Sequence, residues 1–422
     1  MSDSRSAAPP AASLWQHPDF MKLWVGQTIS GFGSRFTELA LPLLAITLLQ
    51  ATPVELGLLT GIAGLPWLFL TPLLGVWIDR VQRRPLLIMT DLGRGMVLLL
   101  VPLAAWSGFL RIELLYAIAL VQSLLTVGFE TAYQAYLPNL LDRSQLVDGN
   151  SKLMISSSAA DVAGPSLAGL LIQLLSAPLA LGLDGLSFLI SAFSLHLIRA
   201  PEPKPQSVVQ QHFWAALREG VHAIAQQPIL RALTSTNATF MFFFGIVQAV
   251  LLLVFTQLLQ LSAPMIGLIF GIGGAGGLLG ASLAQRISRR AGLGRTVLGA
   301  ALARAAGLAL LPVVFWLPAA NVFWVVAALY TLHQGGWSIW AITQGSLRQS
   351  LTPAHLQGRV TASFLVVVRS AMPLGALLGG LLGQAAGLIP TFVVGSIGML
   401  AASVWLLPVR LWKLQTTPGS DG

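Results

Sequence analysis

Long apolar stretches, separated by short polar connectors, run along nearly the whole chain. Each has roughly 20 residues or more, the length that an α-helix needs to cross the hydrocarbon core of a bilayer. Backbone groups in lipid must pair within the protein, and these stretches are too long and too evenly apolar for the strands of a barrel. We therefore predict twelve membrane-spanning helices, at 23–49, 55–78, 86–107, 113–137, 151–174, 178–199, 229–258, 264–285, 295–317, 320–345, 361–386 and 389–410.

The composition fits a chain whose main solvent is lipid. Of the 422 residues, 55% are apolar and only 9% are charged, whereas a soluble domain carries about 25% charged residues. The formal charge of +9 is spread over the connectors, which argues against nucleic acid as a partner. Because the chain has no cysteine, disulfides, thiolate metal sites and cysteine nucleophiles are excluded.

The positions of the basic residues predict the orientation. Of the 24 Lys and Arg residues, only Arg111 lies in a connector on the side opposite the termini. Four more lie in the interior of predicted spans, away from the span ends: Arg35, Arg94, Arg304 and Arg369. Excess positive charge marks the cytoplasmic side of a membrane protein, so the tails 1–22 and 411–422 are both predicted to be cytoplasmic.

The two halves of the chain repeat at a shift of 210 residues. GLLTGIAG from Gly57 matches GLIFGIGG from Gly267. Further matches pair Arg94 with Arg304, Pro102 with Pro312, Trp106 with Trp316, Gln134 with Gln344 and Gly169 with Gly379. Paired Arg and Trp residues inside spans are hard to obtain by chance at one shift. The sequence therefore predicts an all-α membrane protein of two pseudo-symmetric six-helix bundles, 23–199 and 229–410.

The segment 200–228 between the halves is predicted to be a cytoplasmic linker. Its Pro-rich start, APEPKPQ, favours an extended chain. Residues 213–225 can form an amphipathic helix on the inner membrane surface. A simple tether is favoured over a regulatory element.

The connector after the second predicted helix reads GVWIDRVQRRP and contains Gly75, Asp79, Arg80, Arg83 and Arg84. A glycine allows close helix packing, an aspartate can cap the start of a neighbouring helix, and arginines can pair with acids or lipid headgroups. The connector resembles the signature loop of the major facilitator superfamily, a gate element that holds the two halves together in one state. Ordinary cytoplasmic positive charge explains the arginines but neither Gly75 nor Asp79.

Two further charges follow in the next predicted helix. Asp91 and Arg94 lie three residues apart, and we group them with the gate element. For this pair, as for Arg304, an internal ion pair that holds helices together is the favoured interpretation.

The predicted helix 151–174 contains ADVAGPSLAG, which resembles a motif that marks antiporters in the same superfamily. Gly164, Pro165 and Gly169 match this motif, whereas Ala168 departs from it. A Gly-Pro bend frees a carbonyl group and permits tight helix packing. Gly and Pro are also common in membrane helices, so the motif favours an antiporter without proving one.

The stretches FMKLWVGQTISGFGSRFTELALPLL, YLPNLLDRSQLVDGNS and SLTPAHLQGRVTASF resemble the macrolide-efflux and siderophore-exporter branch of the drug:proton antiporters. The resemblance extends over nearly the whole chain and implies a multi-pass protein of the bacterial inner membrane. One position departs from the pattern. The predicted helix 113–137 has an acid, Glu130, and no arginine where many proton antiporters carry one, which puts a proton relay copied from those relatives in doubt.

Polar residues inside the spans are costly in lipid and mark a pathway or a partner. Gln27, Ser34 and Glu38 share one face of the first predicted helix, and Arg35 is available as an ion-pair partner for Glu38. The resemblance implies that the first, fourth, seventh and tenth predicted helices line a central cavity. The polar or aromatic candidates on the last three are Gln122, Thr126, Glu130, Gln134, Asn237, Gln248, Gln334 and Trp337.

Three other charged residues need an interpretation. Asp161 lies near the midplane of its predicted helix, and Arg369 lies in the mirror helix 361–386; for both, a structural ion pair and a role in transport are equally favoured. Asp184 is expected near the outer membrane surface, exposed to headgroups.

As the proton carrier we rank Glu130 first, because it has no basic residue within a turn of its own helix. Glu38 comes second and Asp161 third.

These features predict a secondary active transporter that exports hydrophobic or amphipathic small molecules by proton antiport and alternating access. The expected partners are the bilayer, the substrate and protons, with no nucleic acid, no cofactor and no metal, in a monomer powered by the proton gradient. A lipid flippase or a solute symporter of the same fold is the alternative. No Walker loop, nucleophile elbow or HExxH motif occurs, which argues against an enzyme.

Overall fold

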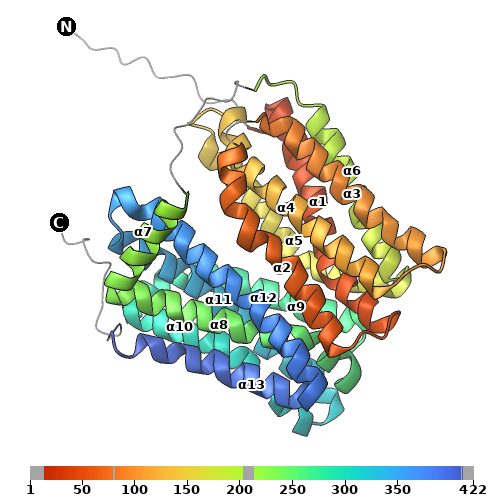
Figure 1. Cartoon of the computed structure of the whole chain (residues 1–422), viewed down its shortest axis with the longest axis vertical. Helices are drawn as coiled ribbons and strands as arrows, with labels where there is room; N and C mark the ends of the chain where they lie inside the picture. Colours follow the sequence, from red (N-terminus) through yellow and green to blue (C-terminus); the bar gives the residue numbers. More distant parts are fainter. Residues whose placement is uncertain (1–13, 79–80, 203–212, 410, 412–422) are drawn as a thin grey trace.

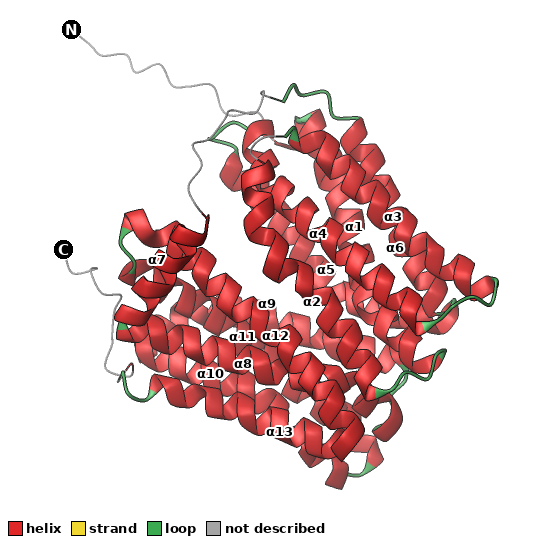
Figure 2. Cartoon of the chain, viewed as in Figure 1, coloured by secondary structure: helices red, strands yellow, loops and turns green. Residues whose placement is uncertain are grey.

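The computed structural model describes residues 14–78, 81–202, 213–409 and 411 of the chain. Among these residues all regular secondary structure is helical (Figure 2). The first half contains α1 (Pro18–Thr47), α2 (Pro53–Ile78), α3 (Arg83–Trp106), α4 (Ile112–Leu140), α5 (Leu146–Leu174) and α6 (Ala177–His196). The second contains α8 (Pro228–Leu253), α9 (Ala263–Ala291), α10 (Leu293–Ala309), α11 (Ala319–Leu351), α12 (Gln357–Ala386) and α13 (Leu388–Ala401), preceded by the linker helix α7 (Phe213–Gln226).

Three helices continue into tighter or wider turns. α8 runs into a π-helical segment, Val254–Leu258, while α10 and α13 are followed by 3₁₀ segments, Leu311–Trp316 and Ala402–Leu406. Two glycines in the left-handed region, Gly292 (φ 86°) and Gly387 (φ 89°), connect α9 to α10 and α12 to α13 without a loop. Glycine has no Cβ to oppose this conformation, so each pair reverses direction within one residue.

Nine helices within the described residues are long and apolar enough to span a bilayer. The predicted spans on α1, α2 and α11 are not among them. α1 carries several charged residues, α11 is rich in amide and hydroxyl side chains, and the side chains of α2 beyond Trp67 lie outside the described part of the structure. The protein is thus a multi-pass, all-helical membrane protein, while the count of twelve spans stays a prediction.

The helices gather into two groups (Figure 1). α1 packs on α5 and α6, α3 on α4 and α6, and α2 on α4; in the second group α8 packs on α12 and α13, and α11 on α9 and α10. The groups meet mainly where α2 crosses α12 and where α5 crosses α9. The 210-residue repeat relates α2 to α9 and α5 to α12, so each crossing joins one helix of each repeat-related pair.

Glycines permit both crossings. A Cβ added to Gly57 of α2 would lie 2.9 Å from the Cα of Gly380 on α12, and one added to Gly267 of α9 would lie 3.1 Å from the Cα of Gly169 on α5. Gly57 and Gly267 are the pair that the 210-residue shift predicts, and they occupy equivalent contacts. Gly379, the predicted match of Gly169, faces Ile246 of α8 instead.

The linker helix α7 is docked on α12. Glu219 forms an ion pair with Arg359, and Ser363 Oγ donates a hydrogen bond of 3.0 Å to the Leu217 carbonyl. The predicted helix 213–225 is therefore present, with one more residue at its end. Its attachment to the second group shows that this part of the linker is held in place.

Asp19 fastens the start of α1 to the chain beyond α6. Its carboxylate accepts hydrogen bonds from Lys22 Nζ at 2.7 Å and from the backbone N–H groups of Arg199 and Ala200 at 3.2 and 2.9 Å. Burial alone would raise the pKa of Asp19, but these donors outweigh burial and lower the pKa below its usual value.

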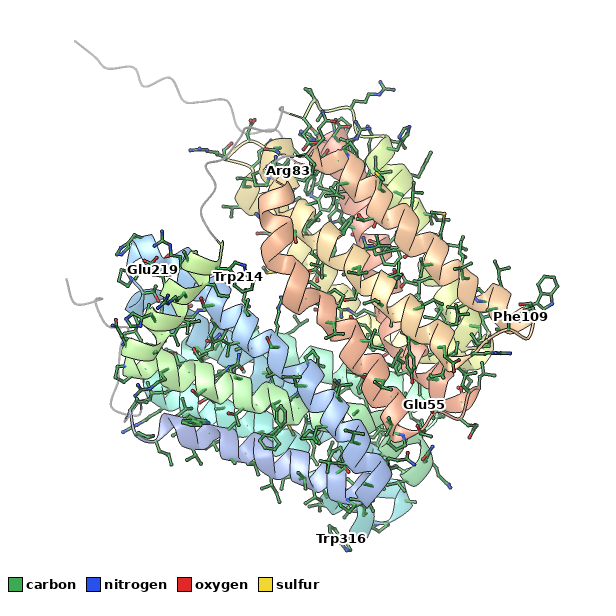
Figure 3. All side chains as sticks on the ribbon, viewed as in Figure 1. Glu55, Arg83, Phe109, Trp214, Glu219 and Trp316 are labelled. Carbon is green, nitrogen blue, oxygen red and sulfur yellow. The ribbon has the colours of Figure 1, made fainter. Side chains whose placement is uncertain are left out.

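Exposed charged and aromatic side chains lie at both ends of the molecule. Arg83, Trp214 and Glu219 lie at one end, and Phe109 and Trp316 at the other (Figure 3). Trp316 is 80% exposed and its predicted repeat partner Trp106 is 90% exposed. Exposed tryptophans at helix ends are typical of the membrane interface.

This arrangement allows a direct test of topology. Cysteines introduced singly at Arg83 and Arg111 in this cysteine-free chain are expected to react with an impermeant maleimide from opposite sides of the membrane, because Arg83 begins α3 and Arg111 precedes α4. The measurement compares labelling of intact cells with labelling of inside-out vesicles. Reaction of both cysteines from one side would contradict the predicted topology.

Candidate transport site

Arg35 joins two carboxylates from different helices. Its Nη1 lies 2.6 Å from Glu38 Oε1 on α1, and its Nη2 lies 2.8 Å from Asp161 Oδ1 on α5. The spacing of three residues predicts the first contact; the second exists because α1 and α5 pack together. Glu38 and Asp161 are both partly exposed, so the cluster is a charged surface inside a predicted membrane segment.

Gly164 permits this contact. A Cβ at Gly164 would lie 2.7 Å from the Cβ of Arg35, closer than side chains approach one another. The first residue of the antiporter-like motif therefore lets α1 come close to α5. Gly169, the last, faces α9, where an added Cβ would collide with the Ala263 carbonyl oxygen, and the carbonyl of Pro165 faces Gly267 in the same crossing. The motif thus lies at a crossing between the two groups of helices.

Glu130 on α4 is exposed and, within the described residues, forms no hydrogen bond or ion pair. Its electrostatic partners at longer range are Arg369 of α12 first, then Arg94 and Arg35. On the same predicted stripe Gln134 is also exposed, whereas Gln122 and Thr126 are half-buried. Among the acids predicted to carry a proton, Glu130 alone lacks a bound cation among the described residues.

Asp91 and Arg94 form a buried ion pair within α3. Asp91 is 0% exposed, and the guanidinium of Arg94 stacks between the rings of Phe129 and Phe188, 4.1 Å from each centroid. The predicted ion pair is therefore present. Its burial among α3, α4 and α6 places it in the packing of the first group rather than at the gate with which it was grouped.

Arg304 corrects the prediction of an ion pair at this position. The side chain is fully buried, and no acid contacts it within the described residues. Its Nη1 donates to Asn237 Oδ1 at 3.0 Å, and its guanidinium lies over Phe240 and Trp340 at 3.9 and 4.1 Å. The repeat explains the difference, because the position matching Asp91 is Ala301. Aromatic faces replace the carboxylate as partners of the cation.

Some predicted cavity residues take part in helix packing instead. Gln27 Nε2 donates to Ser191 Oγ of α6 at 3.1 Å, and Asn237 binds Arg304. Gln248, Gln334 and Trp337 are half-buried, with Trp337 in contact with the ring of Phe240. The sequence assigns each of these residues to a helix, but contacts with neighbouring helices decide which way the side chain faces.

Asp184 was predicted to be exposed to headgroups, and this prediction is wrong. The residue is 0% exposed between α6 and α1. Thr37 Oγ1 donates to its Oδ2 at 2.5 Å and Ser187 Oγ to its Oδ1 at 2.9 Å. A helix register alone could not reveal this burial, although the small residues Gly182, Gly185 and Ser187 around it are typical of a packed helix face.

Only part of the predicted gate element lies within the described residues. Asp79 and Arg80 lie outside them, and Gly75 belongs to α2. The backbone N–H groups of Arg83 and Arg84 donate to the carboxylate of Glu202 at 2.6 and 3.0 Å. Arg84 also donates through its side chain to two carbonyl groups at the end of α6. Glu202 thus caps the start of α3.

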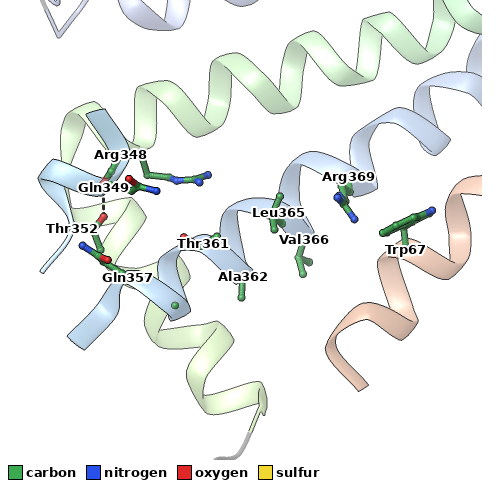
Figure 4. Close-up of a pocket in the computed structure, with 11 residues that line it drawn as sticks. Trp67, Arg348, Gln349, Thr352, Gln357, Thr361, Ala362, Leu365, Val366 and Arg369 are labelled. Atoms are coloured by element: carbon green, nitrogen blue, oxygen red, sulfur yellow. Dashed lines mark hydrogen bonds between the residues drawn. The ribbon is translucent and has the colours of Figure 1, made fainter. Parts of the chain in front are cut away.

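Arg369 lies at a cavity of about 450 Å³ between α2, the end of α11 and the start of α12 (Figure 4). Its guanidinium stacks over Trp67, 4.4 Å from the ring centroid. Because α2 and α12 belong to different groups of helices, Arg369 and Trp67 face each other between the two halves. The sequence predicts Arg369 as a functional candidate but misses the cavity, since residues distant in sequence form its walls.

Comparison with known proteins identifies a family and several relatives. Residues 9–419 match the family described as "Transmembrane secretion effector", of the major facilitator superfamily. The chain is 26% identical over 411 residues to the multidrug efflux pump Tap of Mycolicibacterium fortuitum, covering 92% of this chain and 96% of Tap. It is 24% identical over 235 residues to macrolide efflux protein A of Streptococcus pyogenes, covering 54% of this chain and 57% of that protein.

Solved structures share the fold. The nucleoside transporter NupG aligns with a TM-score of 0.75 at 11% identity, covering 94% of this chain and 99% of that one. A bacterial homologue of the iron transporter ferroportin in its inward-facing state aligns with a TM-score of 0.73 at 19% identity, covering 95% of this chain and all of that one. An outward-facing structure of such a homologue aligns with 0.56 at 20% identity, covering 93% and 99%.

Proposed function

Because the chain belongs to the transmembrane secretion effector family of major facilitator transporters, a class of membrane carriers and not of enzymes, we propose that it exports hydrophobic or amphipathic small molecules by proton antiport. Relatives named as multidrug and macrolide efflux proteins support export of such compounds. The cytoplasmic location of both termini in a bacterial inner membrane is part of this proposal. Its expected substrates resemble drugs and macrolides.

The exposed carboxylate of Glu130 is the observation that carries the proposal. An ionisable group in a membrane helix is costly and is retained for a function. Glu38 and Asp161 are held by Arg35, whereas Glu130 has only distant cations among the described residues. A carboxylate without a bound cation can accept a proton without breaking an ion pair. Glu130 is therefore our proposed proton carrier.

Alternating access requires two arrangements of the helix groups that differ by only a few kcal/mol. The two glycine crossings provide contacts about which the groups can rock. The higher TM-score against the inward-facing ferroportin homologue than against the outward-facing one supports a conformation open to the linker side.

A lipid flippase or a solute symporter is the second candidate. The observation that favours it is the missing arginine on α4, which many related antiporters carry. The three functions differ in how they respond to a proton gradient. An antiporter accumulates substrate on the acidic side, a symporter on the alkaline side, and a flippase moves labelled lipid without a gradient.

Transport by purified protein in liposomes tests the proposal. We expect a quaternary ammonium dye and a macrolide to accumulate in liposomes with an acidic interior, and to stop accumulating when the pH gradient is collapsed. The dye has a permanent charge, so it cannot be trapped passively by protonation, and protein-free liposomes give the background. Accumulation driven by an alkaline interior, or lipid movement alone, would favour the second candidate.

A further inference from the structure

The cavity beside Arg369 is positively charged and amphipathic. Arg348 from the end of α11 and Arg369 from α12 contribute the charge, and none of the described residues that line it is an acid. Trp67, Leu365 and Val366 form an apolar wall. Figure 4 shows Arg369 pointing toward Trp67, with Leu365 and Val366 between Arg369 and the end of α11 that carries Arg348. Its volume of about 450 Å³ is in the range of sites that hold small molecules.

Arg348 has donors without acceptors. Its guanidinium carbon lies over the Phe364 ring, 4.1 Å from the ring centroid, so the cation is in contact with an aromatic face. Its Nε and Nη1 are buried and have no hydrogen-bond partner within the described residues. Buried donors without acceptors are destabilising, and a guanidinium presents its N–H groups as a planar fork that matches a carboxylate or a phosphate.

Arg369 is also available to an anion. Trp67 covers one face of its guanidinium, and within the described residues no carboxylate forms an ion pair with it. Its attraction to Glu130 acts at longer range. Two cations in a cleft whose described walls hold no compensating acid concentrate anions from solution.

We propose that this cavity binds an amphipathic anion, with its carboxylate or phosphate group at Arg348 and Arg369 and its apolar part against Trp67, Leu365 and Val366. The inference goes beyond the proposed export of hydrophobic or amphipathic compounds, because it assigns an anionic ligand to a particular cavity. It concerns equilibrium binding, which is measured without a proton gradient, so its test is independent of the test of proton antiport. The anion can be a soluble compound or the head group of a membrane lipid, and the two sources are separable by experiment.

A competing explanation assigns the two arginines to closure of the protein. In the outward-open state, acids of the first half could approach Arg348 and Arg369 and supply the missing acceptors. This explanation predicts that the arginines are needed for transport of every substrate, and that no anion binds in the conformation described here.

The test uses the full-length protein in nanodiscs of phosphatidylcholine and two water-soluble aromatic probes, 1-naphthyl phosphate and 1-naphthylmethylammonium. Equilibrium binding is measured by calorimetry. We expect the phosphate probe to bind at least tenfold more tightly than the cation, and Arg348→Gln and Arg369→Gln each to weaken it by about tenfold or more. Arg290→Gln removes the same charge from an exposed position of α9 outside the cavity and should leave binding unchanged.

Folding and the source of the anion are controlled separately. Arg348→Lys keeps the charge without the fork, so a variant that elutes and melts like the wild type but binds weakly supports the role of the guanidinium. Nanodiscs that contain phosphatidylglycerol separate the two sources of the anion. If the lipid reduces binding of the phosphate probe only when Arg348 is present, the occupant is a lipid. If probe binding does not change, the occupant is a soluble compound. Three results would overturn the proposal. The two probes could bind equally, or Arg290→Gln could lose as much phosphate-probe binding as the cavity variants. The third is that the phosphate probe does not bind at all while Arg348→Gln loses dye transport.

Discussion

Glu130→Gln is expected to abolish pH-driven export while substrate binding stays close to that of the wild type. Glutamine has the shape of the protonated acid but cannot release a proton. Glu130 is exposed on α4 and has no ion pair within the described residues, so few packing contacts depend on its charge. The variant should therefore fold normally and still exchange substrate between the two sides without net pumping.

Two measurements on proteoliposomes check this result: accumulation against a gradient, which should be lost, and substrate counterflow, which should remain. Glu113→Gln provides the matched control, because Glu113 is an exposed acid in the first turn of the same helix. Pumping by Glu130→Gln at the wild-type rate would show that the proton travels elsewhere, and Asp161 would be the next residue to test.

Gly169→Ala is expected to reduce transport by about tenfold or more and to lower the melting temperature. The added methyl group would collide with the backbone carbonyl of Ala263, which cannot turn away as a side chain can. Overpacking of this kind costs about 1–3 kcal/mol. Because ~1.4 kcal/mol is a tenfold change in an equilibrium, the α5–α9 crossing would open or the balance between transport states would shift.

Gly299→Ala provides the control for this experiment, since an added Cβ at Gly299 of α10 has nothing within 4 Å. Gly267→Ala, on the opposite side of the same crossing, should reproduce the defect through a collision with the Pro165 carbonyl. Thermal unfolding and dye transport measured on the three variants separate loss of folding from loss of cycling. Wild-type transport and thermal stability of Gly169→Ala would mean that the α5–α9 crossing can accommodate an added methyl group.

The sequence by itself determined where the helices lie. The predicted span 229–258 corresponds to α8 and its π-helical extension, Pro228–Leu258, because an apolar segment in lipid must pair its own backbone groups. Helix ends were less predictable: α5 begins at Leu146 and α12 at Gln357, several residues before the predicted spans. These ends carry polar side chains, which hydropathy assigns to connectors although the helix continues.

The sequence also determined contacts within one helix. The spacing of Arg35 and Glu38, and of Asp91 and Arg94, predicts ion pairs that the structure contains. Side chains three residues apart lie on the same face of any α-helix, whatever surrounds it. The repeat likewise predicted that Gly57 and Gly267 are equivalent, and each permits one crossing between the two groups of helices.

Only the tertiary structure decided which faces of the helices meet. It brings Asp161 to Arg35, buries Asp184 against α1 and surrounds Arg304 with aromatic rings where an acid was expected. It also forms the cavity between α2, α11 and α12 that holds two arginines. The physical reason is that these helices are apolar around most of their circumference. Hydropathy therefore leaves their rotation open, and close packing at small residues fixes it.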